Sequence, residues 1–370
     1  MMPYLSPIDH KPSVTYYSKV ACAVTFCVFA FVYLFFYQYD VLTAGQHVLS
    51  GGQTHYNRFV GAVLITLVLY LLQIVVARYA RLTKRAYALT YFPSLLVLTI
   101  ITDVSSTIDE GFSFGGWLVA VPVLLAVFCF LVWALRQMES FEPEPASKGF
   151  FSRTVWINLL SLVVMFFLVG IFSNGDEVFH YRMRVERLLM DGKPEDALKV
   201  GEKSLATDPS LVMLRAYALA QNNELGNHLF DYPIGKGQVG LIPDGRHRKT
   251  ILFSDSIITA FARSPKARAD YRLMGFLIKR QLDAFARFVG DAYPDSVMPK
   301  HFAEALLLYH YYSGKPVPQG QDKTIEADFY GFLDMEKKGG DDHVANQLRR
   351  VYHNTYWYYY KYGENKSMQQ

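Results

Sequence analysis

The sequence predicts an all-α protein in which five transmembrane helices precede a soluble helical domain. Two observations lead to this fold class. The first half of the chain contains five apolar stretches, each long enough to cross a bilayer core of ~30 Å as a helix. The second half has the composition of a soluble domain, and its apolar residues recur at helical spacing. The five stretches are residues 20–37, 59–76, 86–102, 115–135 and 155–172.

Lysine and arginine are distributed unevenly among the segments that connect these stretches. Two connections contain only Arg58, whereas the N-terminal segment and the other two connections hold nine basic residues. By the positive-inside rule, the N-terminus is cytoplasmic and the chain after the fifth stretch lies outside the cytoplasm. We therefore predict a membrane domain over residues 1–172 and an extracytoplasmic domain over residues 173–370. The nine residues are Lys11, Lys19, Arg78, Arg81, Lys84, Arg85, Arg136, Lys148 and Arg153.

The third stretch is short and contains Pro93. Neighbouring helices can satisfy the backbone groups that a proline frees, so we still expect it to span the membrane. Without it, the arginine-rich and acidic connections on its two sides would share one membrane face, against the charge bias. The first stretch is longer than the ~7–15-residue core of a signal peptide, which predicts a retained anchor.

Composition excludes several classes of function. The formal net charge of +4 is spread evenly over the two halves, so neither half has the basic patch of a nucleic-acid-binding protein. No charged side chain lies inside the five stretches, which argues against an ion-coupled transporter. All three cysteines, Cys22, Cys27 and Cys129, lie in predicted spans, so the extracytoplasmic domain folds without disulfides. We predict no cofactor and no metal.

The extracytoplasmic domain begins with a predicted helical hairpin. Apolar residues recur at helical spacing over 176–190, and a turn then leads to a second helix over 194–206, which Pro194 opens. The hairpin resembles a tetratricopeptide repeat, although Val185 and Gly201 depart from the pattern of that repeat. The residues that match its turn, small contact residue, apolar residue and helix stop are Gly192, Ala197, Leu205 and Pro209.

Six more helices are expected in this domain. Stacked helical repeats form a solenoid whose concave face binds extended peptides or other helices. The alternative is a set of plain helical hairpins packed as a cap. The predicted helices cover residues 211–222, 266–279, 281–292, 300–313, 324–337 and 342–360.

A glycine- and proline-rich loop is predicted over residues 231–248. It contains Gly235, Gly237 and Gly240 at the spacing of the GxGxxG dinucleotide fingerprint. That fingerprint requires a strand before it and a helix after it, and Pro243 with Gly245 blocks such a helix. We therefore predict no nucleotide site.

The loops predicted to face outward contain histidines and carboxylates. The first carries Asp40, His47 and His55, and the next carries Asp103 and Asp109. Such groups could act as acid and base on a lipid-linked substrate, or bind a metal. Asp40 is similarly placed to an acidic residue in polytopic sugar transferases that use lipid-phosphate donors, but those enzymes have more spans. The alternative is that these are ordinary hydrogen-bonding residues at the level of the lipid headgroups.

Two other groups are candidates for binding. Arg246 and Arg248 belong to a basic cluster that either contacts an anionic headgroup or glycan, or forms a solvated loop edge. Tyr356 and Trp357 belong to an aromatic run near the C-terminus. That run either forms a docking surface at the lipid interface or packs inside the helical domain.

Two segments resemble an uncharacterised family of multi-pass membrane proteins from Bacteroides-type bacteria. They are residues 46–57, QHVLSGGQTHYN, and residues 354–360, NTYWYYY. The resemblance implies a Gram-negative inner membrane and a periplasmic C-terminal domain. We expect a membrane-anchored scaffold or assembly factor that contacts membrane lipids and an envelope protein. The alternative is an enzyme that acts on a lipid-linked sugar or a lipid headgroup at the outer face of the inner membrane.

Overall fold

The computed structural model describes residues 14–111, 114–139, 151–235, 240–294, 298–314, 322–337 and 342–363. Within these residues every regular element is a helix and no strand occurs, so the all-α prediction is confirmed. The chain forms two compact units, Met1–Asp176 and Glu177–Gln370. We call them the membrane unit and the helical unit, and describe each by itself.

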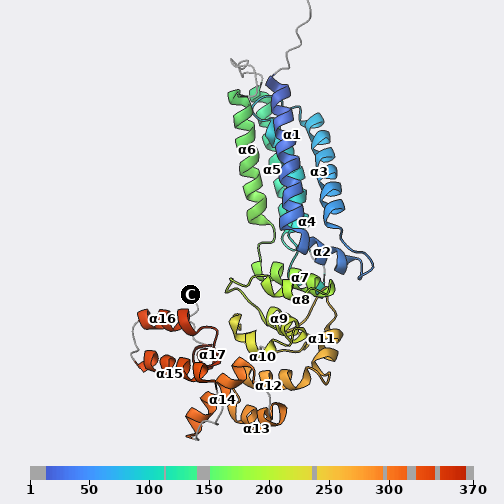
Figure 1. The fold of residues 1–370 in the computed structure, drawn as a ribbon. Helices are drawn as coiled ribbons and strands as arrows, with labels where there is room; N and C mark the ends of the chain where they lie inside the picture. The colour runs from blue at the N-terminus through green and yellow to red at the C-terminus, as the bar shows by residue number, and fades with distance from the viewer. Residues whose placement is uncertain are drawn as a thin grey trace, which may run out of the picture. The chain divides into compact units, whose positions relative to one another are not determined.

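The membrane unit is a bundle of long apolar helices (Figure 1). In the described residues, four segments are long and apolar enough to cross a membrane, and the third of the five predicted spans corresponds to the shorter apolar segment Tyr87–Thr102. Helix α1 packs against α3 and α6, and α4 packs against α3, α5 and α6. The elements are α1 (Val14–Val32), η1 (Tyr33–Tyr37), α2 (Tyr39–Leu49), α3 (Arg58–Ala80), η2 (Tyr87–Tyr91), α4 (Phe92–Thr102), η3 (Ile108–Glu110), α5 (Trp117–Glu139) and α6 (Arg153–Phe172).

The shorter segment begins as the 3-10 helix η2 and continues as α4. Pro93 lies in the first turn of α4, where a helix needs no backbone N–H, so it starts the helix without kinking it. The 3-10 turns are held by amides from neighbouring helices. Asn158 Oδ1 accepts from the Ala88 N–H at 2.7 Å, and its Nδ2 donates to the Lys84 carbonyl at 2.8 Å. Gln73 Nε2 donates to Tyr87 Oη at 3.1 Å.

Helix α1 ends in the π-helical turn η1. Arg58 donates from Nε to the Phe35 carbonyl at 2.6 Å, and its guanidinium lies 4.1 Å from the centre of the Phe35 ring. Asn57 caps the next long helix, since its Oδ1 accepts from the N–H groups of Phe59 and Val60. Helix α2 lies between η1 and α3 in the chain, and the sequence analysis did not predict it.

The helical unit contains twelve helical elements in its described residues. Six of the predicted helices coincide with α7, α9, α12, α13, α14 and α15 to within two residues at each end. The elements are α7 (Glu177–Met190), α8 (Pro194–Lys199), α9 (Pro209–Gln221), α10 (Leu225–His228), η4 (Leu229–Asp231), α11 (Asp255–Ala262), α12 (Arg268–Ile278), α13 (Leu282–Ala292), α14 (Lys300–Ser313), α15 (Lys323–Lys337), α16 (Asp342–Tyr352) and α17 (Tyr356–Tyr362).

The second helix of the predicted hairpin is shorter than expected. It was predicted over residues 194–206, but α8 ends at Lys199. Gly201 has a φ of +61°, and a Cβ at this position would lie 2.7 Å from the Tyr181 ring. Only glycine fits both requirements. After α8 ends, the carbonyls of Val200 and Gly201 accept hydrogen bonds from the Arg215 guanidinium at 3.2 and 3.1 Å.

The last predicted helix, residues 342–360, is two helices. The chain turns at residues 353–355, and the Thr355 side chain caps α17 by accepting from the Tyr358 N–H at 3.4 Å. The continuous prediction was therefore wrong, because an internal threonine cap interrupts an otherwise helical pattern.

The long loop before α11 is fixed to the unit by one buried carboxylate. Glu186 on α7 is 0% exposed, and its Oε2 accepts from the N–H groups of Ile251, Leu252 and Phe253 at 2.8, 2.6 and 3.1 Å. Gly235 and Gly240 lie in irregular backbone, while positions 236–239 of the glycine pattern are outside the described residues. The described part of this loop has no strand before the pattern, and the next helix begins only at Asp255.

Candidate functional site

The five candidates from the membrane loops lie at four different places in the membrane unit. Asp40 and His47 belong to α2, where Asp40 is 1% exposed. His55 is exposed in the segment before α3, Asp103 follows α4, and Asp109 lies in η3. Among the described residues, no three His, Cys, Asp or Glu side chains are grouped so that they could hold a metal ion.

His47 belongs to the turn that ends α2. Its carbonyl accepts from the Gly52 N–H at 2.8 Å, and a Cβ on Gly52 would lie 3.4 Å from the imidazole. Gly51 and Gly52 have φ values of +59° and +80°, so both adopt backbone that favours glycine. The glycine pair therefore serves the local fold of this loop.

Of these five, Asp103 lines a large cavity at the loop end of the bundle. This loop cavity has a volume of about 1180 Å³ and is enclosed by α2, the connection from α4 to α5 and the end of α6. Trp117 donates from its indole Nε1 to Asp103 Oδ2 at 2.7 Å. The wall is largely apolar, with polar groups from Gln46, Tyr56 and Asn174. The lining carries two carboxylates, Asp103 and Asp176, in an otherwise largely apolar wall.

The helical unit has a cleft of about 980 Å³ that the sequence analysis did not predict. We call it the helical-unit cleft. Its apolar wall combines leucines with aromatic rings, and charged side chains of both signs surround that wall. One side is formed by residues between α8 and η4, and the other by α16 and α17. The lining includes Leu198, Glu202, Leu205, Leu219, Glu224, His228, Phe230, Asp231, Tyr232, Arg349, His353, Tyr358 and Tyr359.

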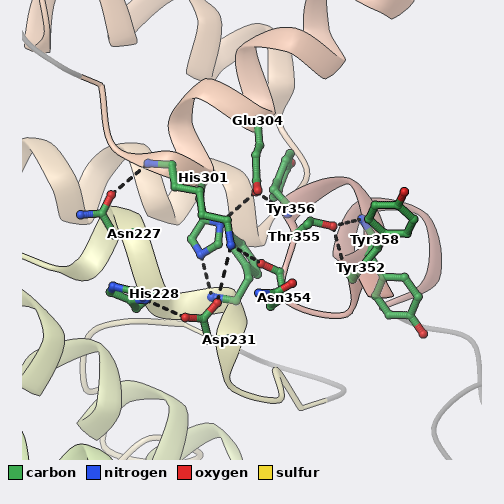
Figure 2. A network of polar contacts seen from close by, with 12 residues as sticks. Asn227, His228, Asp231, His301, Glu304, Tyr352, Asn354, Thr355, Tyr356 and Tyr358 are labelled. Carbon is green, nitrogen blue, oxygen red and sulfur yellow. Dashed lines mark hydrogen bonds and ion pairs between the residues drawn. The ribbon is translucent and has the colours of Figure 1, made fainter. Parts of the chain in front are cut away.

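A buried pair under the cleft connects three segments of the chain (Figure 2). His301 and Glu304 on α14 are 0% and 1% exposed. The Phe230 N–H donates to His301 Nε2 at 3.3 Å, so the imidazole proton lies on Nδ1 and is donated to Glu304 Oε2 at 2.9 Å. The same oxygen accepts from the Tyr356 N–H at 2.7 Å. The pair thus fixes η4 and the start of α17 against α14.

His228 lies at the edge of the cleft between two carboxylates. Its Nδ1 is 2.6 Å from Asp231 Oδ2, and its Nε2 is 3.6 Å from Glu224 Oε2. Lys300 extends the group, because its Nζ lies 3.9 Å from Asp231 Oδ1 and donates to the Asn354 carbonyl at 3.1 Å. The hydrogen-bond partners of the two imidazoles in the described residues are the carboxylates of Asp231 and Glu304 and the Phe230 N–H.

The aromatic candidates are core residues of the helical unit. Tyr356 and Trp357 are 0% and 1% exposed. The Trp357 ring centre lies 5.4 Å from that of Phe329, and Tyr356 Oη donates to the Leu277 carbonyl at 3.3 Å. The sequence analysis left two interpretations of the aromatic run, a docking surface or packing inside the helical domain. The burial of Tyr356 and Trp357 agrees with packing for these two rings. Tyr358 and Tyr359 of the same run reach the cleft.

The two arginine candidates have different environments. Arg248 is engaged within its own loop, because Nε donates to the Ile242 carbonyl at 2.8 Å and Nη2 lies 3.0 Å from Asp244 Oδ2. The backbone amides of Arg248, Arg246 and His247 lower the pKa of Asp244 to about 2. Arg246 is exposed. Arg248 therefore stabilises its own loop, and Arg246 is the arginine of this pair that is exposed to solvent.

Comparison with known proteins gives one match. A family of unknown function (DUF6057) matches residues 262–363, which run from the end of α11 through α17. No curated protein and no solved structure matches the chain. The matched segment contributes His301, Glu304, Arg349 and His353 to the cleft and the network beneath it. The chain is therefore similar, in this segment, to proteins whose activity is also not known.

Sequence reasoning missed the residues that build the cleft. His228 with Asp231, and His301 with Glu304, are each three apart, the spacing of neighbours on one helical face. That spacing was a usable signal. The contacts to Phe230 and Tyr356 join residues 71 and 52 positions apart, and no local pattern encodes them.

Proposed function

We propose that this protein is a membrane-anchored scaffold or assembly factor for envelope proteins, and that its helical unit binds a segment of a partner protein in the helical-unit cleft. The observation that carries the proposal is the lining of that cleft. Aromatic rings, leucines and an arginine surround it, and such residues are enriched in protein-binding surfaces. The helical hairpins around it are the kind of frame that the tetratricopeptide resemblance implies.

The proposal includes five spans, with the segment Tyr87–Thr102 as the third. With 3-10 and α-helical rises, this segment is about 26 Å long, close to the ~30 Å of a bilayer core. Asn158 and Gln73 satisfy its polar groups, as a spanning segment requires. The charge bias then gives a cytoplasmic N-terminus and a periplasmic helical unit in a bacterial inner membrane.

Site-specific photo-crosslinking in cells tests the cleft. A crosslinking residue at Leu205, which is 60% exposed in the cleft, is compared with one at Ile257, which is 47% exposed on α11. We expect one envelope protein to be captured from position 205 and not from position 257. Leu205→Glu should abolish co-purification of that partner, and Ile257→Glu should not. Equal capture at both positions, or none at 205, would contradict the proposal.

The loop cavity supports a second candidate, an enzyme that acts on a lipid-linked sugar or lipid headgroup. Its specific observation is Asp103, a carboxylate oriented by Trp117 inside a cavity of about 1180 Å³. Asp103→Asn keeps the side-chain shape and the indole contact but removes acid–base chemistry. If this variant abolished the cellular function while capture at position 205 stayed intact, the enzyme would replace the scaffold. We expect the variant to retain function.

A further inference from the structure

The membrane unit has another cavity at the opposite end of the bundle from the loop cavity. Its volume is about 640 Å³, and it is lined by the first turns of α1, the last turns of α3 and the connection to η2. Helix α1 packs against α3 and η2, so all three walls belong to one packed group. We call it the basic cavity.

Three cationic side chains line this cavity. They are Lys19 on α1, Arg78 on α3 and Arg81 directly after α3, and all three are exposed. No aspartate or glutamate is among the described lining residues. In the described part of the chain, no carboxylate forms an ion pair with any of the three. Positive charge is therefore concentrated on one cavity and left uncompensated there.

The remaining walls are apolar and continue along the helices. Val20 and Val24 come from α1, and Ile74 and Ala77 from α3. Two buried polar side chains form a bonded group beside them: Gln73 Nε2 donates to Tyr87 Oη at 3.1 Å, and Lys19 Nζ lies 5.9 Å from the Tyr87 ring centre. Cations at the mouth of an apolar groove match a molecule with an anionic head and hydrocarbon chains.

We propose that the basic cavity binds an anionic phospholipid, with Arg78, Arg81 and Lys19 around its phosphate. Guanidinium groups pair with phosphate oxygens through two parallel hydrogen bonds, and acyl chains extend along Val20, Val24 and Ile74. A free phosphate would use the cations but not the apolar walls. This site depends on the membrane placement of the bundle and not on the partner-binding proposal, and charge bias places it in the cytoplasmic leaflet.

Native mass spectrometry of the full-length protein in mixed micelles tests the site. The probes are phosphatidylglycerol, which is anionic, and phosphatidylethanolamine, which carries no net charge. We expect the wild type to retain phosphatidylglycerol preferentially, and Arg78→Gln with Arg81→Gln to weaken retention about tenfold. The matched control is Arg136→Gln with Arg153→Gln, which removes two charges at the same end of the bundle but outside the cavity.

Equal loss of lipid in the two double variants would overturn the proposal, because general surface charge would then explain retention. Displacement of the lipid by millimolar inorganic phosphate would also overturn it, since the site would then recognise phosphate alone. If the cavity variant fails to fold, Lys19→Gln on α1 replaces it, with an expected loss of about threefold. Retention by Lys19→Gln equal to that of the wild type would then count against the site.

Discussion

The two units stabilise their buried polar backbone groups with different chemistry. In the described spans and in Tyr87–Thr102, the buried polar side chains are neutral, as Gln73, Ser94 and Asn158 illustrate. In the helical unit, buried side chains with the same role include ionisable ones, as Glu186, Arg215 and Glu304 illustrate. A charge is far more costly to bury in a bilayer than in a soluble domain.

The comparison also shows what such residues do. Asn158 holds a 3-10 turn, Glu186 holds the loop 251–253, and Arg215 holds the backbone that follows α8. Each of these three contacts reaches irregular backbone, whose groups have no partner within a regular helix. A buried polar side chain thus supplies the bond that helix geometry does not. Asp40, which is 1% exposed on α2, shows that the membrane unit also buries an acidic residue outside its spans.

The largest expected contrast is between two tryptophans. Trp357 is 1% exposed in the helical unit, whereas Trp156 is 57% exposed on a membrane helix. Trp357→Ala should lower the free energy of unfolding by about 3–5 kcal/mol because it leaves a cavity. Trp156→Ala should cost less than about 1 kcal/mol, since lipid replaces the ring. Thermal unfolding of the full-length protein in detergent measures both, and an equal cost would mean that this face of α6 packs against protein.

The next contrast is in pH dependence. Burial raises the pKa of Glu186 to about 7, although Arg182 and three backbone amides oppose the shift. Between about pH 4.5 and 7 the unfolded chain has lost this proton and the folded chain has kept it, so stability falls as pH rises through that window. The loss is on the order of 3 kcal/mol.

Glu186→Gln provides the control for this pH dependence. The amide keeps an acceptor for the three N–H groups but does not titrate, so the difference in stability between the wild type and the variant should change across that window. A difference that is constant from pH 4 to 8 would show that Glu186 keeps the same protonation state in the folded and unfolded chains.

The smallest expected contrast is within the membrane unit. Asn158→Leu removes the contacts to Ala88 and Lys84, and we expect a loss of about 1–2 kcal/mol, as for interhelical hydrogen bonds in bilayers. Ser161→Ala, three residues away, should be nearly neutral, because Ser161 is exposed and bonds only to its own helix at Ile157. Unfolding in detergent compares them. Similar losses would mean that the 3-10 turn does not depend on Asn158.

The sequence predicted those parts of the fold that depend on local periodicity. Helix α14 begins at Lys300 and ends at Ser313, as predicted, because its apolar spacing, Pro299 and Gly314 are all local signals. The end of α8 was not predicted, because the conformation of Gly201 depends on the Tyr181 ring. Helix α2 was not predicted, because the segment between the apolar stretches 20–37 and 59–76 was interpreted as a loop.

The candidate site was less accessible to prediction than the fold. Titratable residues in the membrane loops can be recognised from residue type alone, and of these candidates Asp103 lines the loop cavity. The helical-unit cleft forms where residues 198–235 meet residues 349–363. The contact between these two distant segments depends on packing across the whole unit. It cannot be predicted from the residue types at individual positions.

The hydrogen bond from Phe230 to His301 bears on how the chain can be dissected. The family match begins at residue 262, but the acceptor nitrogen of His301 is satisfied from residue 230, and the Lys300 N–H is satisfied by Asn227. The apolar core is likewise shared, because Val212, Leu219 and Phe230 pack with Phe302 and Trp357 in one cluster. The segment that matches the family, residues 262–363, is therefore smaller than the helical unit that folds around one core. A fragment that begins at residue 262 would expose apolar core residues and leave the His301 nitrogen and the Lys300 N–H without these partners.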